Sequence, residues 1–194
     1  MGRLLPIPAG GCLKRPDIVL VFINPTARNI SSKKSWKGPR FPFVGTNQVW
    51  RVLSNAGLVS GDFSQIRKGD WTVGFARGLE RTLKKRKIAL TNLCKETKPD
   101  GRNPGKEEIE RGKKKLFREI GRMRPRAIIA MGLIPFEAIA GKKIKLKESA
   151  GKSFPAEILG RQYNVRPCYF PVGRGNPKKA EETLKLILKK LSRR

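Results

Sequence analysis

Residues 17–56 read DIVLVFINPTARNISSKKSWKGPRFPFVGTNQVWRVLSNA, and this stretch contains the pattern that decides the fold. The apolar run of residues 18–23 is mostly β-branched and ends at Asn24-Pro25, which predicts a buried strand of a parallel sheet. A long loop follows at residues 25–45, and an amphipathic helix is predicted from about Thr46 to Ala56. In open α/β sheets, ligands bind outside the carboxyl ends of the strands. We therefore expect Asn24 to lie at the edge of a pocket.

The same alternation of strands and helices continues to the end of the chain. Further strands are predicted at residues 88–91, 127–131 and 165–171, and further helices at 76–85, 106–123, 135–140 and 178–191. Residues 1–16 read as an irregular lead-in, and residues 142–165 as a hairpin or an extended excursion. The pattern predicts one domain over residues 1–194, with a three-layer α/β/α architecture around a central, mainly parallel four-stranded sheet.

The charge of the chain is strongly one-sided. Its 194 residues include 44 Lys and Arg, 15 Asp and Glu and no His, which gives a formal net charge of +29. A highly charged thermophilic surface is one explanation, but such surfaces add charges of both signs, and acids are scarce here. The charge favours a nucleic acid as the partner, because cations release counterions from phosphates. It does not distinguish DNA from RNA.

The residue types that are scarce exclude several classes of chemistry. Cys12, Cys94 and Cys168 are odd in number and far apart, which argues against a disulfide framework and indicates a reducing compartment. Without His or a Cys-x-x-Cys pair, a zinc or iron–sulfur site is not expected, and neither is a His general base. No apolar run approaches the roughly 18 residues of a membrane helix. Residues 4–9 are too short and too Pro-broken for a signal peptide.

Three short motifs follow predicted strands, and each has two interpretations. The amide of Asn24 can hold a water molecule, or Asn24-Pro25 can be a simple turn. Phe41-Pro42-Phe43 can stack on a nucleobase, or it can fill the core below the next helix. Thr91-Asn92 can line the same pocket, or it can end its strand as a polar cap.

Two basic loops are candidates for contacts with phosphates. In the first, Lys33, Lys34, Lys37 and Arg40 surround Trp36. The second, residues 173–179, reads GRGNPKK and precedes the terminal helix, whose N-terminus favours anions. Its tip can enter a duplex, or the loop can be a solvated turn.

In this order, the motifs resemble those of the uracil-DNA glycosylase superfamily, and within it the mismatch-specific uracil/thymine-DNA glycosylases. Residues 22–26, FINPT, stand where that family has Gly-Ile-Asn-Pro-Gly, and FPF at 41–43 is followed by NQVW at 47–50. TNL at 91–93 and RPRAIIAMG at 124–132 match later segments, so the similarity spans roughly residues 17–190. Thr26 departs from the first motif, and VGRGNP at 172–177 replaces an Asn-Pro-Ser-Gly-like second motif. Three cysteines cannot supply four ligands, which excludes the four-cysteine branches.

The resemblance implies a monofunctional DNA glycosylase of base excision repair. It would hydrolyse the N-glycosidic bond of a flipped uracil, of thymine opposite guanine, or of a deaminated base such as hypoxanthine. It implies Asn24 as the catalytic residue, no cofactor or metal, and a monomer that binds mismatched double-stranded DNA in the cytoplasm of a prokaryote, associated with the nucleoid. The implied base-binding residues are Phe22, Ile23, Pro25, Phe41, Phe43, Thr91 and Asn92. The implied DNA-binding residues are Lys33, Lys34, Arg40, Gly173, Arg174, Gly175, Asn176, Lys178 and Lys179, with Arg174 as the wedge.

Two alternatives remain open from the sequence. One is a nucleic-acid-binding protein of the same fold that is catalytically weak or inactive, which the altered second motif and the charge favour. The other is an RNA-binding or ribosome-associated basic protein, which the charge alone allows.

Overall fold

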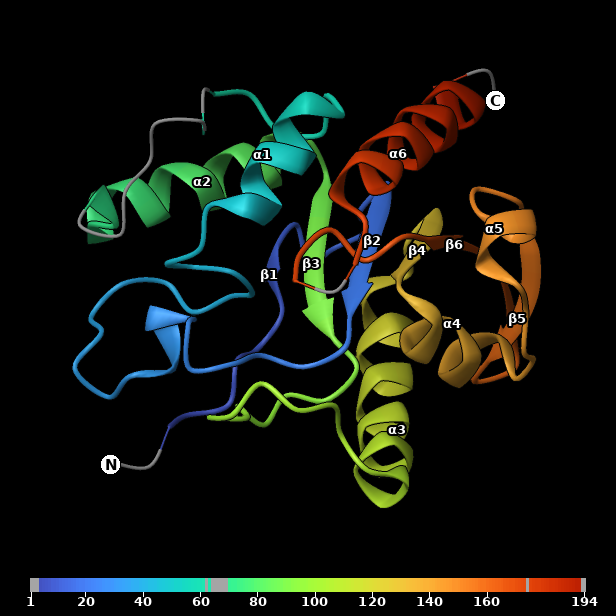
Figure 1. The fold of residues 1–194 in the computed structure, drawn as a ribbon, viewed down its shortest axis with the longest axis horizontal. Coiled ribbons are helices and arrows are strands. Elements are labelled where there is room, and N and C mark those ends of the chain that lie inside the picture. Colours follow the sequence, from blue (N-terminus) through green and yellow to red (C-terminus); the bar gives the residue numbers. More distant parts are fainter. Residues whose placement is uncertain (1–3, 62, 64–69, 174, 193–194) are drawn as a thin grey trace.

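The computed structural model describes residues 4–61, 63, 70–173 and 175–192. Within them the chain forms a sheet with helices on both faces (Figure 1). The strands are β1 (Gly10–Gly11), β2 (Ile18–Phe22), β3 (Ile88–Asn92), β4 (Ala127–Met131), β5 (Phe154–Ile158) and β6 (Arg161–Cys168). The helices are η1 (Ile30–Ser32), α1 (Gln48–Asn55), α2 (Val73–Lys85), α3 (Lys106–Met123), α4 (Leu133–Ala140), α5 (Leu146–Ser149) and α6 (Pro177–Ser192).

The strand order of the sheet is β1-β3-β2-β4-β6-β5. The four central strands are parallel, while β1 and β5 pair antiparallel at the two edges. The predicted three-layer α/β/α architecture is therefore confirmed, but the sheet has six strands where four were predicted. β1 was not predicted, since residues 1–16 were expected to be an irregular lead-in. β5 forms a hairpin with β6, as one of the two interpretations of residues 142–165 allowed.

Two apolar clusters cover the two faces of the sheet. One joins alternate residues of the strands, such as Leu20 and Phe22, to α1, α2 and α6. The other joins the intervening residues, such as Val19 and Val21, to α3 and α4. Figure 1 shows α1 and α2 to the left of β3, α6 at the upper right, and α3 extending below the strands. Because β2 and β4 are buried on both faces, their sequences are apolar at every position.

The N-terminal segment makes the sheet wider through two glycines. A Cβ added at Gly10 would lie 2.2 Å from Cβ of Phe41, and one added at Gly11 would lie 2.3 Å from the backbone oxygen of Ile88. Only glycine allows so close an approach. This edge strand therefore depends on the absence of side chains, and no hydrophobic pattern marks it.

No helix in the described part of the chain is both long enough and apolar enough to cross a membrane.

Candidate functional site

The ends of β2 and β3 lie side by side at the centre of the sheet. Phe22 is the register partner of Asn92 in the parallel pairing. Pairing continues for two residues, since N–H of Leu93 donates to the oxygen of Phe22 at 2.7 Å and N–H of Cys94 donates to that of Ile23 at 2.9 Å. The carboxyl ends of these strands therefore bring Asn24 and Asn92, predicted separately from the sequence, to one edge of the sheet.

Asn24 is partly buried. Its Nδ2 donates to the oxygen of Pro25 at 3.2 Å and to that of Arg102 at 3.5 Å. These bonds fix the amide plane between the strand end and the loop of residues 95–105. Among the described residues, none donates to Oδ1 of Asn24, so this atom can accept a hydrogen bond from a water molecule.

Asn92 is almost completely enclosed, with a relative exposure of 1%. Neither its Nδ2 nor its Oδ1 has a hydrogen-bond partner among the described residues. A buried polar group without a partner costs about 1–3 kcal/mol. In a parallel pair, register partners point to the same face, so this amide lies on the face of Phe22, the side covered by α1, α2 and α6. An amide kept there without partners is suited to a ligand that brings both a donor and an acceptor.

Phe43 lies on the same face, against Phe22. The two ring centroids are 4.5 Å apart and the rings meet edge to face at 69°. Phe43 has a φ of +69°, which L-residues rarely adopt. Its carbonyl oxygen holds this conformation by accepting from Nε1 of Trp50 at 2.9 Å and from Oγ1 of Thr46 at 3.1 Å. The first turn of the following helix therefore sets the position of the Phe43 ring. Phe22, Phe43 and Asn92 lie on the same face of the sheet, and we call these three residues the amide–aromatic slot.

Two predicted base-binding residues lie elsewhere. Phe41 is 1% exposed and packs edge to face on Trp50, with ring centroids 6.1 Å apart. It is a core residue, as the alternative interpretation of the FPF motif allowed. Thr91 points to the opposite face of the sheet from Asn92, because side chains alternate along a strand. Its Oγ1 donates to Oε2 of Glu119 on α3 at 2.6 Å.

Lys95 completes a buried polar cluster around Thr91. Its Nζ donates to Oγ1 of Thr91 and lies 2.7 Å from Oε2 of Glu119. Burial lowers the pKa of the Lys95 ammonium, and the Glu119 carboxylate opposes that effect. This cluster joins the end of β3 to α3. Sequence reasoning missed Lys95 and Glu119, since they are 24 residues apart in the chain and no local pattern links them.

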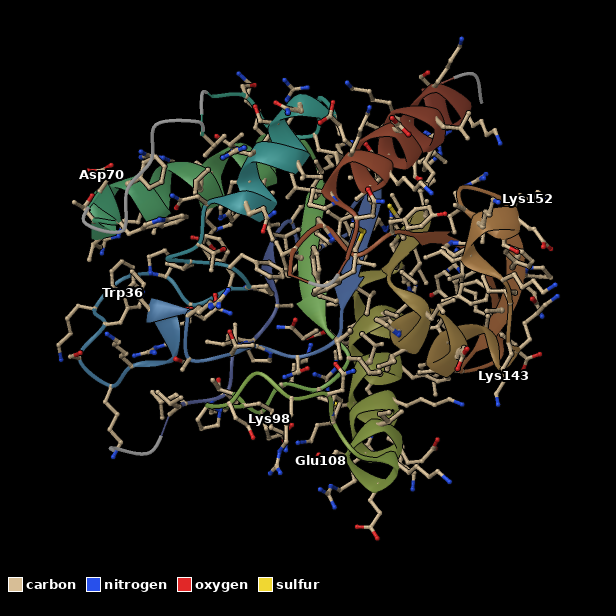
Figure 2. All side chains as sticks on the ribbon, viewed as in Figure 1. Trp36, Asp70, Lys98, Glu108, Lys143 and Lys152 are labelled. Atoms are coloured by element: carbon tan, nitrogen blue, oxygen red, sulfur yellow. The ribbon has the colours of Figure 1, made fainter. Side chains whose placement is uncertain are left out.

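The loop after β2 is ordered from within by Arg40. Its guanidinium donates to the backbone oxygens of Ser31, Lys33 and Trp36. Trp36 in turn donates from Nε1 to the oxygen of Pro39 at 2.9 Å (Figure 2). Arg40 therefore orders the loop, and its predicted contact with a phosphate stays a prediction. Lys33 and Lys34 of the same loop are exposed and form none of the ion pairs found among the described residues.

In the loop before α6, the backbone at Gly175 passes close to the backbone of Phe170. A Cβ at Gly175 would lie 2.0 Å from the oxygen of Phe170. Asn176 accepts from N–H of Lys179 at 3.0 Å through Oδ1, so its side chain caps α6. Gly173, Lys178 and Lys179 are exposed beside this cap, at a helix N-terminus that favours anions. Arg174, the predicted wedge, lies outside the described residues.

The polar groups of the loop that starts after β3 are tied to α3. Lys98 forms an ion pair with Glu108, and Glu108 accepts from N–H of Gly105 at 2.9 Å (Figure 2). The Lys98 ammonium and the Gly105 amide lower the pKa of the Glu108 carboxyl. These contacts hold the segment whose Arg102 carbonyl accepts from Asn24.

The cysteines lie in different surroundings. Burial raises the pKa of the Cys94 thiol to about 11 and that of Cys168 to about 12. Cys94 belongs to the cluster under α3, and Cys168 to the cluster on the other face. The described residues contain no group of three or more His, Cys, Asp or Glu side chains that could hold a metal ion.

These features define an α/β/α protein with a candidate ligand site at the carboxyl ends of two neighbouring parallel strands. The model of the uracil DNA glycosylase superfamily matches residues 9–192. The chain therefore belongs to the uracil DNA glycosylase superfamily, and the sequence-based assignment to it is confirmed.

A segment of the chain is also similar to a characterised relative. It is 35% identical over 88 residues to a Type-4 uracil-DNA glycosylase of Pyrobaculum aerophilum. The matched segment is 43% of this chain and 45% of that protein, so it spans less than half of the relative. The more specific resemblance to the mismatch-specific branch stays a prediction.

Proposed function

We propose that the chain is a DNA glycosylase that hydrolyses the bond between C1′ and the base of a flipped uracil. The observation that carries this proposal is the enclosed amide of Asn92, which has no partner among the described residues and lies on the same face as Phe22 and Phe43. Membership of the superfamily and the name of the Pyrobaculum aerophilum relative support the same reaction.

Base recognition would come from the amide–aromatic slot. The imide edge of uracil offers a carbonyl acceptor beside an N–H donor, and a side-chain amide offers the complementary pair. Asn92 would donate from Nδ2 and accept at Oδ1, and so satisfy both of its orphan atoms. The ring of Phe43 would stack on the base, which contributes about 1–3 kcal/mol. Ile23 and Pro25 would line the entrance, and backbone N–H groups near Phe22, Ile23 and Phe43 would hold the leaving base.

Asn24 would hold the attacking water through Oδ1, which accepts no hydrogen bond from the described residues. An amide is neutral and a poor base, so bond cleavage must run ahead of attack. Both electrons of the C1′–N bond leave with the base, and an oxocarbenium-like sugar remains. The water then adds to C1′ and releases its proton, which leaves an abasic sugar and a free base.

Lys95 gives a reason to expect no lyase step. A lyase reaction needs a lysine amine that attacks C1′. Lys95 lies three residues beyond Asn92, but Thr91 and Glu119 hold its ammonium on the opposite face of the sheet. We therefore propose a monofunctional enzyme.

The DNA duplex would lie over the carboxyl edge of the sheet, with the target base extruded into the slot. Extrusion costs least for a mispaired or damaged base, which adds selectivity before chemistry. Exposed lysines on both flanking loops, Lys33, Lys34, Lys178 and Lys179, would contact phosphates. The backbone around Gly173 and Gly175 would approach a phosphate at the N-terminus of α6. A role of Arg174 as the wedge stays part of this proposal.

A panel of duplexes that carry one U·G, U·A, T·G or hypoxanthine pair tests the proposal. We expect abasic product from the uracil duplexes, and no abasic product from any duplex across a range of temperatures would refute it. Cleavage confined to bases opposite guanine, including thymine, would support the mismatch-specific subtype. Equal cleavage of uracil opposite adenine and guanine would reject that subtype and preserve the glycosylase assignment.

A further inference from the structure

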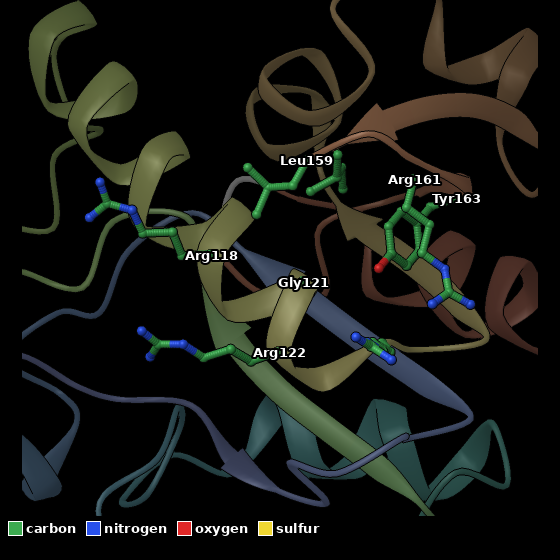
Figure 3. A pocket seen from close by; sticks show the side chains of 8 residues that line it. Arg118, Gly121, Arg122, Leu159, Arg161 and Tyr163 are labelled. Carbon is green, nitrogen blue, oxygen red and sulfur yellow. The ribbon is translucent and has the colours of Figure 1, made fainter.

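A concave feature away from the amide–aromatic slot lies between the C-terminal half of α3 and the β5–β6 hairpin. It is a hollow of about 430 Å³ (Figure 3). We call it the arginine hollow, and it is lined by Arg118, Gly121, Arg122, Arg124, Ile158, Leu159, Arg161 and Tyr163.

The arginine hollow and the amide–aromatic slot lie at opposite ends of the parallel strands. β6 runs parallel to β4 and begins at Arg161, and the antiparallel β5 ends at Ile158. The tip of this hairpin is therefore at the amino ends of the parallel strands, whereas Asn92 is at a carboxyl end. A strand of five residues is about 16 Å long at 3.3 Å per residue. The protein surface that contacts DNA at the slot would therefore not extend to this hollow.

Four arginines line the hollow. None of them takes part in the ion pairs found among the described residues. Arg118 and Arg122 are exposed one turn apart on α3, and Arg124 is exposed at its end. Arg161 lies over the ring of the buried Tyr163, 5.8 Å from its centroid. Arginine forks are suited to phosphate oxygens.

The floor of the hollow depends on a glycine inside a helix. A Cβ at Gly121 would lie 3.0 Å from Cδ1 of Leu159, and Leu159 has a φ of +51° at the hairpin tip. A helical glycine costs about 1 kcal/mol relative to alanine, and here it allows the tip to approach α3. The negative end of the α3 dipole explains cations at Arg122 and Arg124. It does not explain Arg161, which comes from another element.

We propose that the arginine hollow binds the sugar–phosphate backbone of a second DNA segment. Figure 3 shows the guanidinium groups of Arg118 and Arg122 pointing to one side of the hollow and that of Arg161 to the other. One compact anion cannot reach groups that diverge in this way, whereas a strand crossing the hollow contacts both sides. The protein then holds two DNA segments, one at the carboxyl ends and one at the amino ends of its parallel strands. This inference goes beyond the proposed function and does not depend on catalysis.

The test uses the full chain and two charge-matched variants. One carries Arg118→Gln, Arg122→Gln and Arg161→Gln in the hollow. The other carries Lys143→Gln, Lys147→Gln and Lys152→Gln, which are all exposed. Lys147 is part of α5, and Figure 2 shows Lys143 and Lys152 on the same side of the molecule. Each protein is saturated with a short duplex that contains an abasic-site analogue, and a labelled undamaged duplex is then titrated in at several salt concentrations.

We expect the wild type and the lysine variant to bind the second duplex, and the arginine variant to lose it. Each lost phosphate contact lowers the slope of log Kobs against log[salt] by about 0.9, so three lost contacts lower it by about 2.7. Binding of the first duplex and single-turnover cleavage should stay unchanged in both variants, which separates this proposal from the glycosylase assignment.

Three results would overturn the proposal. Equal losses in both variants would show a general charge effect, and no loss in either would show that DNA does not use the hollow. Binding of inorganic tripolyphosphate at the hollow, with unchanged second-duplex binding, would assign it to a small anion. If the triple variant unfolds, the double change at the exposed Arg118 and Arg122 gives the same comparison.

Discussion

Replacing Asn92 by leucine should make the protein more stable and less active at the same time. Leucine has the same branching as asparagine, and it removes two buried polar atoms that have no partner among the described residues. Each such atom costs about 1–3 kcal/mol, and some of the gain is offset because the leucine methyl groups crowd the slot. We expect a net gain of about 2 kcal/mol in the free energy of unfolding, or about 4–8 °C in Tm for a chain of this size.

Cleavage should fall strongly in the same variant. The polar edge of uracil would meet methyl groups and lose two hydrogen bonds in an enclosed site, so we expect a single-turnover rate at least about 100-fold lower. Urea denaturation gives the stability, and alkaline strand scission of a U·G duplex gives the rate. A variant that is less stable than the wild type would show that the amide is satisfied in the free protein. A variant that cleaves normally would show that Asn92 does not read the base.

The neighbouring residue provides the matched control. Thr91→Val is also a near-isosteric change of a buried polar side chain at the end of β3, but it removes hydrogen bonds to Glu119 and Lys95. We expect it to lower the free energy of unfolding by about 1–3 kcal/mol, because bonds to charged groups are lost. Since Thr91 points away from the slot, cleavage should stay within about twofold. A strong loss of cleavage here would restore Thr91 to the base-binding residues.

Other parts of the site make separate predictions. Asn24→Ala should abolish cleavage and leave DNA binding nearly intact, measured by single-turnover kinetics and by fluorescence anisotropy; equal activity would refute its role. Phe43→Leu should weaken the productive complex by about 1–3 kcal/mol, because the ring of Phe43 is expected to stack on the base. Phe41→Leu should lower Tm and preserve cleavage, because the ring of Phe41 packs in the core. The Cys168 thiol should add stability that is fully present below its ordinary pKa of 9.0 and falls as the pH rises toward its folded pKa of about 12. Urea unfolding at about pH 8 and about pH 10.5 should therefore show a smaller decrease for Cys168→Ala than for the wild type, and equal decreases would contradict burial as the cause.

The strands and helices with strong periodicity could be predicted to the residue. The α3 helix at 106–123 and the β4 strand at 127–131 have the bounds expected from their apolar spacing. The family resemblance implied a pocket shared by Asn24 and Asn92, and the parallel pairing of β2 with β3 does bring these two strand ends together. The bounds of α3 and β4 need only local patterns.

The roles within the aromatic and threonine motifs could not be predicted in this way. Phe41 and Phe43 are equivalent in a sequence, and the positive φ of Phe43 is what turns its ring onto Phe22. Alternation along β3 shows that Thr91 and Asn92 face opposite sides. It does not show which side carries the slot, since that depends on the packing of α1 against β2. The role of Arg40 in ordering its loop could not be predicted either, because the carbonyls that it binds become neighbours only once the loop has folded.

In the proposed enzyme, the end of β3 separates stability from base recognition between two consecutive residues, Thr91 and Asn92. Toward α3, Thr91, Lys95 and Glu119 satisfy one another and secure the strand. Toward α1, Asn92 keeps two polar atoms without partners among the described residues, and Phe43 keeps an unfavourable backbone conformation. Unsatisfied groups and backbone strain persist only where the surrounding structure outweighs them, and they concentrate at functional sites. The satisfied cluster on one face can supply part of that stabilisation to the slot on the other, because both are attached to the same five-residue strand.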